Sequence, residues 1–324
     1  MPPASSSPLP GRVRVFAPGS VGNIGPGLDV LGLAVAGAGD RVTAAWSDAP
    51  GIRLADAGHP ELPTDPDRHA SALAAAAVLR RAGAAGQAAA GGRGLVLWAG
   101  KGLPLAGGQG GSAASAVAGA VAANALLGAP LGRAELLAAC LEAEAVVAGR
   151  HLDNIAPILL GGAVLVRSME PIDVVPLPVP AWLHVVLCHP AQRLRTAEGR
   201  AALPTSVPLP VALHQAAQVA AIVAAFATGD AALLARAIDD RIAEPARAPL
   251  LPGFAEAKAA ALAAGALGSS ISGSGPTTFA LARDAADGER IAAAMQAAYA
   301  ERGIAASVRV APVDRAGARL EPLP

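Results

Sequence analysis

The stretch Leu103–Ser115 reads LPLAGGQGGSAAS and places four glycines within five residues, directly before a run of alanines. Glycine adopts backbone angles that other residues resist, and it lets a ligand approach the main chain closely. The alanine-rich run predicts a helix over 113–128, and the N-terminus of a helix offers free N–H groups and a partial positive charge. The stretch therefore predicts an anion-binding loop suited to a polyphosphate, with the Ser112 hydroxyl in reach of a phosphate oxygen or a metal ion. On the loop alone, a flexible alanine–glycine connection fits equally well.

Two familiar phosphate motifs do not describe this loop. No Gly-Lys-Ser/Thr follows the glycines, and Lys101 precedes them instead, so the loop is not of the Walker A type. The glycine spacing also does not match the dinucleotide-binding fingerprint.

Composition limits the classes of protein that the chain can represent. The residues are 53% hydrophobic and 15% charged, and this composition excludes a disordered chain. The length of 324 residues is sufficient for two domains. Aromatic residues make up only 2%, so the core is expected to consist of small and aliphatic side chains. The formal net charge is zero, with 25 basic and 25 acidic residues and no basic block, which argues against a nucleic-acid partner.

The remaining sequence features favour a cytoplasmic protein. Cys140 and Cys188 lie in apolar runs without metal-binding spacing, so we expect buried thiols in a reducing compartment. The segment 1–12 lacks the pattern of a signal peptide and is expected to be a disordered tail. No apolar stretch is expected to be long and clean enough to span a membrane, and no membrane partner is predicted.

Local patterns predict a mixture of strands and helices in both halves of the chain. Strands are predicted over 12–18, 29–35, 40–48, 94–100, 161–168, 182–190 and 306–314, with a turn entering a strand in 269–284. Helices are predicted over 69–83, 113–128, 131–149, 211–227, 231–243, 254–266 and 288–303. The proline-rich segment 170–181 is read as a linker or an edge segment. Because strands and helices do not alternate regularly, the pattern predicts two α+β domains rather than a doubly wound sheet.

Three stretches in order resemble the motifs of one family. They are APGSVGNIGPGLDVLGLAV at 17–35, LPLAGGQGGSAAS at 103–115 and SISGSGPTTFAL at 270–281, and they are similar to the three motifs of the GHMP small-molecule kinases. The first motif is similar to the form found in homoserine kinases, as are the segments 142–162 and 244–254. The resemblance extends over nearly the whole chain from Val13 onward.

The resemblance implies a two-domain α+β GHMP kinase fold. Its N-terminal domain, 13–170, would be like domain 2 of ribosomal protein S5 and would bind ATP. Its C-terminal domain, 171–324, would be ferredoxin-like and would contribute substrate contacts. A homodimer is also implied, and twofold dimers are the commonest assemblies.

The resemblance also implies a reaction, which is transfer of the ATP γ-phosphoryl group to the side-chain hydroxyl of L-homoserine in threonine biosynthesis. The triphosphate would be wrapped by the loop 104–114, which comprises Pro104, Leu105, Ala106, Gly107, Gly108, Gln109, Gly110, Gly111, Ser112, Ala113 and Ala114. Mg²⁺ requires hard oxygen ligands, which Ser112 and Glu144 would supply, with Glu142 as the alternative carboxylate. On residues alone, either glutamate also fits a solvated helix face.

The chemistry of a small zwitterion predicts its contacts. Its carboxylate would bind Arg200 and Arg247, because a guanidinium forms paired hydrogen bonds to a carboxylate, and its ammonium would bind Asp29. Asn23, His151 and Asn154 would donate or accept neutral hydrogen bonds, and Asn23, Asn154 and Ser112 are the predicted catalytic residues. HLDN at 151–154 also fits a helix-capping turn. Asp153 is not assigned as a general base, because the hydroxyl proton can pass to the phosphate itself.

The chain departs from the family pattern in both glycine-rich motifs. Gln109 and Gly111 replace a leucine and a serine of the usual loop, and Gly22 and Leu28 replace an alanine and a phenylalanine of the first motif. The altered loop leaves open a ligand-binding regulator that has lost catalysis. A GHMP kinase of another small alcohol is the second alternative, and the polarity of the pocket decides against or for it.

Overall fold

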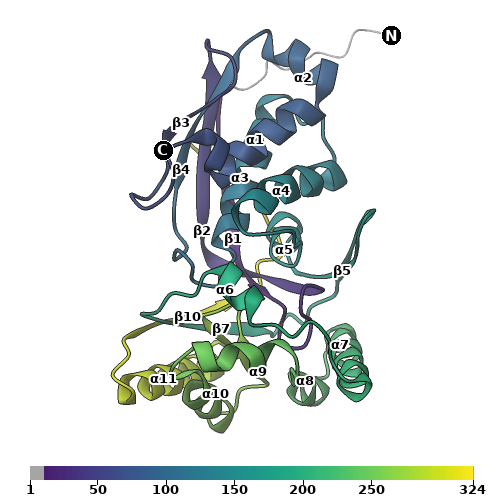
Figure 1. Cartoon of the computed structure of the whole chain (residues 1–324), viewed down its shortest axis with the longest axis vertical. Helices are drawn as coiled ribbons and strands as arrows, with labels where there is room; N and C mark the ends of the chain where they lie inside the picture. Colours follow the sequence, from purple (N-terminus) through teal and green to yellow (C-terminus); the bar gives the residue numbers. More distant parts are fainter. Residues whose placement is uncertain (1–10, 324) are drawn as a thin grey trace.

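Two β-sheets organise the chain, and Figure 1 shows the larger one with its helices above the smaller one. The structure is a computed structural model, and it describes residues 11–323. The larger sheet has the order β11-β1-β2-β4-β3, and β5 pairs with both β2 and β6. Its strands are β1 (Arg12–Gly22), β2 (Leu31–Ser47), β3 (Ile52–Asp56), β4 (Gly94–Gly100), β5 (Ala163–Met169), β6 (Ile172–Leu177) and β11 (Arg319–Glu321). All pairs are antiparallel except β3 with β4.

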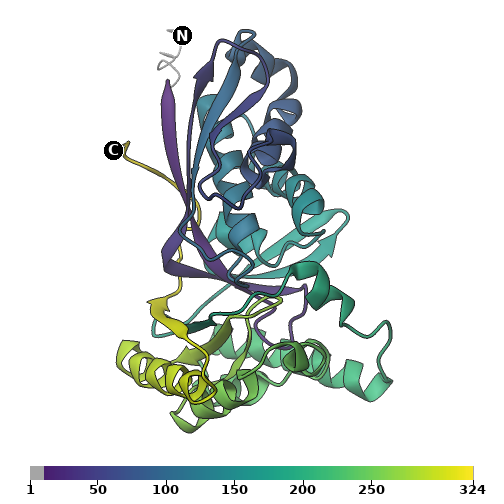
Figure 2. The ribbon, with the colours of Figure 1, turned by 60° about the vertical axis from the view of Figure 1, so that its left-hand side comes forward.

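The longest ladder joins β1 to β2, and it reaches from the larger sheet towards the smaller one (Figure 2). The sequence predicted two strands, 29–35 and 40–48, where the structure has the single strand β2. The register shifts between Pro18, which faces Gly39, and Gly19, which faces Val35. Residues 36–38 form a bulge there, and Gly37 has a φ of 94°. The bulge interrupts the alternation of apolar and polar residues in the sequence, but the strand continues through it.

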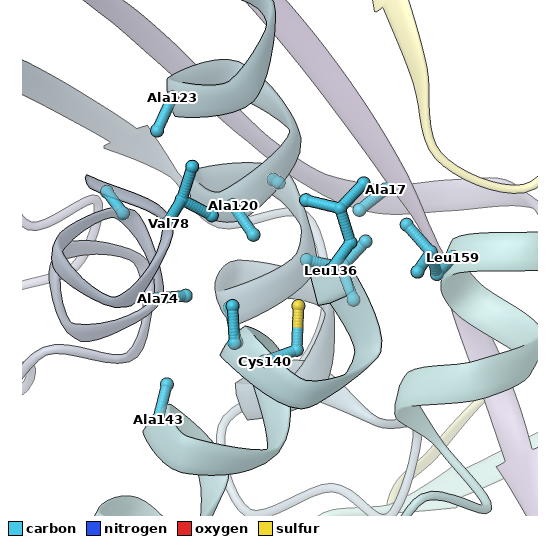
Figure 3. Close-up of a cluster of buried hydrophobic side chains, with 14 of the residues drawn as sticks. Ala17, Ala74, Val78, Ala120, Ala123, Leu136, Cys140, Ala143 and Leu159 are labelled. Atoms are coloured by element: carbon cyan, nitrogen blue, oxygen red, sulfur yellow. The ribbon is translucent and has the colours of Figure 1, made fainter. Parts of the chain in front are cut away.

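Five helices of the described residues pack in the larger domain, and their shared core is rich in alanine. They are α1 (Ala70–Arg81), α2 (Gly83–Ala90), α3 (Gly111–Leu126), α4 (Arg133–Val147) and α5 (Ile155–Leu160), with the 3-10 turn η1 (Pro66–Arg68) before α1. Figure 3 shows small side chains of α1, α3 and α4 meeting around Cys140. Because such side chains let helix axes approach closely, the core excludes water without aromatic residues. Cys140 and Cys188 are buried free thiols, as predicted.

The smaller sheet has the antiparallel order β10-β7-β9-β8. Its strands are β7 (His184–Pro190), β8 (Ser269–Ile271), β9 (Thr278–Ala282) and β10 (Ala306–Pro312). The associated helices are α6 (Thr196–Ala201), α7 (Leu209–Thr228), α8 (Ala231–Ala237), α9 (Ala243–Arg247), η2 (Ala248–Leu250), α10 (Phe254–Ala263) and α11 (Ala285–Glu301). One face of the sheet packs against α10 and α11. The other face shares a core with α7, α8 and the adjoining ends of β1 and β2, so an apolar layer joins the two domains.

The predicted division at 170/171 does not coincide with the division between the sheets. β6 pairs with β5, and β11 returns to pair with β1, so both belong to the larger sheet. The segment from β7 to β10 is thus an insertion into the larger domain. The short elements β3, α2, α5, α6, α9 and β11 were not predicted. Of the predicted tail, residues 1–10 lie outside the described part of the chain, and Arg12 begins β1.

Helix α7 contradicts the expectation that no stretch is long and apolar enough to cross a membrane. This helix is long and apolar enough to cross a membrane, judged by its length and composition alone. That is weak evidence for a membrane span, because core helices of soluble proteins pass the same test. Ile222, Ala225 and Phe226 of α7 are buried in the apolar layer between the domains.

Candidate active site

A cavity of about 570 Å³ is lined by residues of both domains and has the predicted phosphate loop in its wall. Of the eleven predicted loop residues, eight line the cavity: Pro104, Leu105, Ala106, Gly107, Gly108, Gly110, Gly111 and Ser112. Ala113 and Ala114 are instead buried within α3. The Gln109 side chain is buried against the smaller domain.

The carbonyl groups of three consecutive loop residues are each held by a hydrogen bond. The Gly107 carbonyl accepts a hydrogen bond from Thr277 Oγ1 at 2.6 Å, and the Gly108 carbonyl accepts one from Ser272 Oγ at 2.7 Å. The Gln109 carbonyl accepts the Ser20 N–H at 3.1 Å. In a trans peptide, C=O and N–H point in opposite directions. The N–H groups of residues 108, 109 and 110 therefore point away from these anchors, which is the geometry of an anion-binding nest.

Two of the loop glycines are required by their conformation and surroundings. Gly108 and Gly110 both have a φ of 72°. A Cβ at Gly110 would lie 2.2 Å from Ser20 Oγ, and one at Gly108 would lie 2.5 Å from the Ser272 carbonyl oxygen. Gly111 begins α3 outside this left-handed region, and its nearest neighbour, Lys101 Nζ, would lie 3.4 Å from a Cβ.

A buried ion pair supports the start of α3, and no motif in the sequence predicted it. Lys101 pairs with Asp40, whose other oxygen accepts the N–H groups of Gly102 and Leu103 at 3.1 and 3.3 Å. Lys101 Nζ also donates to the Gly111 carbonyl at 2.9 Å. The ammonium thus lies at the base of the loop, where it ties the start of α3 to Asp40.

The predicted metal ligands, Ser112 and Glu144, lie together in the cavity wall. Ser112 Oγ donates to Glu144 Oε1 at 2.7 Å, whereas Glu144 Oε2 is buried without a hydrogen-bond partner. Burial raises the pKa of Glu144 to about 7, although its bond to Ser112 opposes the shift. An unpartnered buried carboxylate oxygen beside a hydroxyl fits a hard divalent cation that shares its other ligands with phosphate. Among the described residues there is no group of three acidic, His or Cys side chains that would hold a metal alone.

The alternative carboxylate, Glu142, lies elsewhere. It is part of the solvent-exposed side of α4, where it pairs with Arg80 and Arg81 of α1. It does not line the cavity, so the geometry favours Glu144.

The turn after β1 directs Asn23 and Asp29 towards the cavity. Both residues have left-handed backbones, with φ of 71° and 61°. Asn23 Oδ1 accepts the Asp29 N–H at 3.0 Å, and Asn23 Nδ2 donates to the Gly273 carbonyl at 2.9 Å. Asn23 therefore both shapes the turn and joins it to the smaller domain, and one N–H of its amide remains for a ligand.

The two predicted arginines lie in different environments. Arg200 of α6 donates to both carboxylate oxygens of Asp29, at 2.6 and 2.8 Å. Burial raises the pKa of Asp29, but the hydrogen bond and charge of Arg200 outweigh it, so this pKa lies below its usual value. Arg247 of α9 is only 4% exposed and donates to the carbonyls of Gly199 and Gly273, at 3.0 and 2.8 Å. Within the described residues it has no salt bridge, so its charge is available to an anionic ligand.

The segment HLDN supplies three further cavity residues, His151, Asp153 and Asn154. His151 Nδ1 and Asp153 Oδ1 are buried without hydrogen-bond partners. Burial lowers the pKa of His151 and raises that of Asp153 to about 7. Asn154 Oδ1 accepts the Ser20 hydroxyl at 2.8 Å, so the amide is held beside the loop.

Gly22 makes room for this segment. A Cβ there would lie 2.5 Å from Asp153 Oδ2 and 2.7 Å from Asn154 Nδ2. The departure from the family's alanine at this position thus accompanies a close approach of HLDN to β1.

The wall between β3 and α1 was missed by the sequence analysis. Leu62, Pro63, Arg68 and His69 line the cavity there. Apart from turn signals such as Pro63 and Pro66, this segment carries no pattern that points to a ligand, and only the folded chain brings it beside the loop.

Known proteins match this chain over nearly its whole length. The model of the GHMP kinases N-terminal domain matches residues 70–162, and the GHMP kinases C-terminal model matches residues 222–301. A protein of Chlorobium phaeovibrioides named homoserine kinase is 42% identical over 95% of this chain and 99% of its own length. A homoserine kinase of Arabidopsis thaliana is 44% identical over 95% of this chain and 84% of its own length.

A solved structure agrees in fold. The crystal structure of a homoserine kinase from Cytophaga hutchinsonii superimposes with a TM-score of 0.92 and 38% identity, covering 98% of this chain and all of that one. The predicted α+β GHMP kinase fold is therefore confirmed. With these matches in sequence and structure, the chain belongs to the homoserine kinase family of the GHMP kinases.

Proposed function

We propose that the chain transfers the γ-phosphoryl group of ATP to the side-chain hydroxyl of L-homoserine, which gives O-phospho-L-homoserine and ADP. The observation that carries this proposal is the single cavity that joins a glycine-rich anion loop to Asp29, Arg200 and Arg247. A polyphosphate fits the loop, and a small zwitterion fits the three charged side chains.

The charged side chains would orient the acceptor. Its carboxylate would bind the buried guanidinium of Arg247 together with Arg200, and its ammonium would bind Asp29. Such a ligand replaces the Asp29–Arg200 pair with two new opposite-charge contacts, so no buried charge is left alone. Asn23, His151 and Asn154 would then hold the hydroxyl end by hydrogen bonds.

Phosphoryl transfer depends mainly on positioning and on neutralising charge. The N–H groups of residues 108–110 and the start of α3 would bind the triphosphate, and Ser112 and Glu144 would hold Mg²⁺. When bound, Mg²⁺ supplies positive charge to the phosphate oxygens. The hydroxyl oxygen attacks the γ-phosphorus as the bond to the leaving oxygen breaks, and the hydroxyl proton passes to the transferred phosphoryl group.

Release of ADP in the presence of Mg²⁺ tests the proposal, with homoserine, serine, 4-hydroxybutyrate and mevalonate compared as acceptors. Homoserine-dependent ADP release, with little from the others, supports it. Preference for another alcohol would identify a different acceptor. Ligand binding without turnover on any alcohol would favour a regulator that has lost catalysis.

We further propose a cytoplasmic homodimer. Support for a dimer comes from α7, which carries no charged residue and exposes Leu209 and Leu213 by 70% and 62%. Light scattering coupled to size exclusion tests it, and a mass of one chain would contradict it.

A further inference from the structure

Gln109, which stands where the family usually has leucine, joins the phosphate loop to the smaller domain. Its side chain is 6% exposed, and Nε2 donates to Thr277 Oγ1 at 3.2 Å. Its Oε1 accepts from Arg309 Nη2 of β10 at 3.3 Å. A leucine could form neither bond, so this chain has a polar connection between its domains at that position.

Thr277 sits at the centre of this connection. Its hydroxyl has one proton, which it donates to the Gly107 carbonyl at 2.6 Å. The hydroxyl oxygen therefore accepts from Gln109 Nε2 and from His189 Nδ1, which lies 3.1 Å away. Burial lowers the pKa of His189, which favours the neutral ring that donates through Nδ1–H. Every hydrogen-bonding position of this buried hydroxyl is then used.

Arg309 depends on neutral acceptors. It donates to the Ala36 carbonyl and to Gln109, and it forms no salt bridge within residues 11–323. Burial lowers the pKa of Arg309. The Gln109 side chain alone separates this guanidinium from the backbone of the loop. Its charge is not paired with a carboxylate among the described residues, so it adds to the positive potential at the loop.

We propose that Gln109 and Arg309 form a positioning relay for the phosphate loop. The relay holds the Gly107 carbonyl towards Thr277, and thereby holds the Gly108 N–H in the opposite direction, where phosphate is expected. Arg309 holds the carboxamide of Gln109 in place. It also supplies positive charge on the side of the loop opposite the expected phosphate. Neither side chain touches a substrate, since both act through the backbone of the loop. The inference rests on the proposed function, because it takes the loop as the site of the triphosphate.

The test compares Gln109→Leu, Arg309→Met and the double variant, with Gln296→Leu as the matched control. Gln296 is an exposed residue of α11 whose amide donates to Ala306. Calorimetry with MgADP measures nucleotide affinity directly, and steady-state rates give the KM values for ATP and homoserine. Thermal unfolding confirms that each variant is folded.

Gln109→Leu is expected to weaken MgADP binding and to raise the KM for ATP by about tenfold, because the buried bond to Thr277 is lost and Arg309 loses one of its two acceptors. The KM for homoserine should stay within about twofold of the wild-type value. The double variant should lose less affinity than the product of the single losses, because removing Arg309 also removes the unpartnered donor. Gln296→Leu should match the wild type.

Three results would each overturn the relay. The first is an unchanged MgADP affinity in Gln109→Leu, and the second is an equal change in the KM values for ATP and homoserine. The third is a loss of affinity in the double variant that equals the product of the losses in the single variants. If Gln109→Leu does not fold, Arg309→Met alone decides between a selective loss of nucleotide affinity and none. Because MgADP binding needs no acceptor, the relay can be tested even if homoserine is not phosphorylated. Absence of MgADP binding to the wild type would overturn both proposals.

Discussion

Arg200 and Asp29 come from different domains and form a two-bond ion pair in the cavity, at 2.6 and 2.8 Å. Each side chain is close to 40% exposed, so both remain accessible to a ligand. A ligand with only one charge would leave one partner of the pair without a counter-charge. The pair therefore favours a ligand that carries both signs.

Asp29→Asn is expected to impair use of the acceptor rather than of the nucleotide. The substitution keeps the side-chain shape but removes the charge opposite the ammonium. The KM for homoserine should rise at least about tenfold, with the KM for ATP within about twofold. Initial rates with each substrate varied in turn would measure both. Equal increases would assign Asp29 a structural role.

Arg247→Ala is expected to raise the KM for homoserine far more than the KM for ATP, by about tenfold or more, because the lost guanidinium is buried and lacks a salt bridge within the described chain. Arg247→Lys should recover little, since an ammonium cannot form the paired bonds of a guanidinium. Arg193→Ala is the control, because Arg193 is exposed and pairs with Glu61. Parallel changes in both constants would argue against Arg247 as the carboxylate anchor.

Glu144→Gln is expected to abolish most activity and to weaken the response to Mg²⁺, whereas Glu142→Gln should remain active. Because burial raises the pKa of Glu144 to about 7, its carboxylate is increasingly protonated as the pH falls below that value. The wild-type enzyme should thus need more Mg²⁺ for half-maximal rate at pH about 6 than at pH about 8. Titrations of Mg²⁺ at fixed ATP would measure this. A requirement that does not change with pH would speak against Glu144 as the ligand.

Gly110→Ala and Gly111→Ser are expected to differ sharply although they are neighbours. Gly110 is left-handed and a Cβ would lie 2.2 Å from Ser20 Oγ, so alanine should reduce kcat/KM for ATP at least about tenfold. Gly111→Ser restores the serine of the usual family loop, and 3.4 Å to Lys101 Nζ is an ordinary contact. Its kcat/KM should stay within about twofold or improve. Similar losses in both variants would show that the loop tolerates no side chain at either position.

Asp153→Asn is expected to stabilise the ligand-free protein at alkaline pH. The pKa of Asp153 is raised from 3.8 to about 7, so between these values the folded state binds more protons than the unfolded state. The wild-type free energy of unfolding should therefore fall as the pH rises through this range. The variant lacks this loss, so its Tm should exceed that of the wild type by at least about 2 °C at pH 8 and by less at pH 5. A constant difference at both pH values would contradict the shift.

The main helices and strands of the chain were predictable because their patterns are local. The alternation in β1, the alanine-rich helices and the glycine loop each follow from neighbouring residues. The single strand β2 was divided in two because Gly37 and Gly39 resemble a turn, and only pairing with β1 shows the bulge. β11 is three residues long, and nothing in its own sequence predicts that it returns to β1.

The site was predicted in its residue types but not in its connections. Motif resemblance selected Asp29, Arg200 and Glu144, all of which line one cavity. It could not reveal that Asp29 and Arg200 pair with each other, because they are 171 residues apart. The Lys101–Asp40 pair and the Gln109–Arg309 contact join distant segments in the same way, and such contacts depend on tertiary structure.

The insertion of the smaller sheet between β6 and β11 has a consequence for how such enzymes diversify. The larger domain contains the points where the inserted segment begins and ends, and it carries the loop proposed to bind phosphate, whereas Arg200 and Arg247 belong to the insertion. Exchange of the insertion would therefore alter both arginines, and the loop would stay in place only if the new segment kept the anchors Thr277 and Arg309.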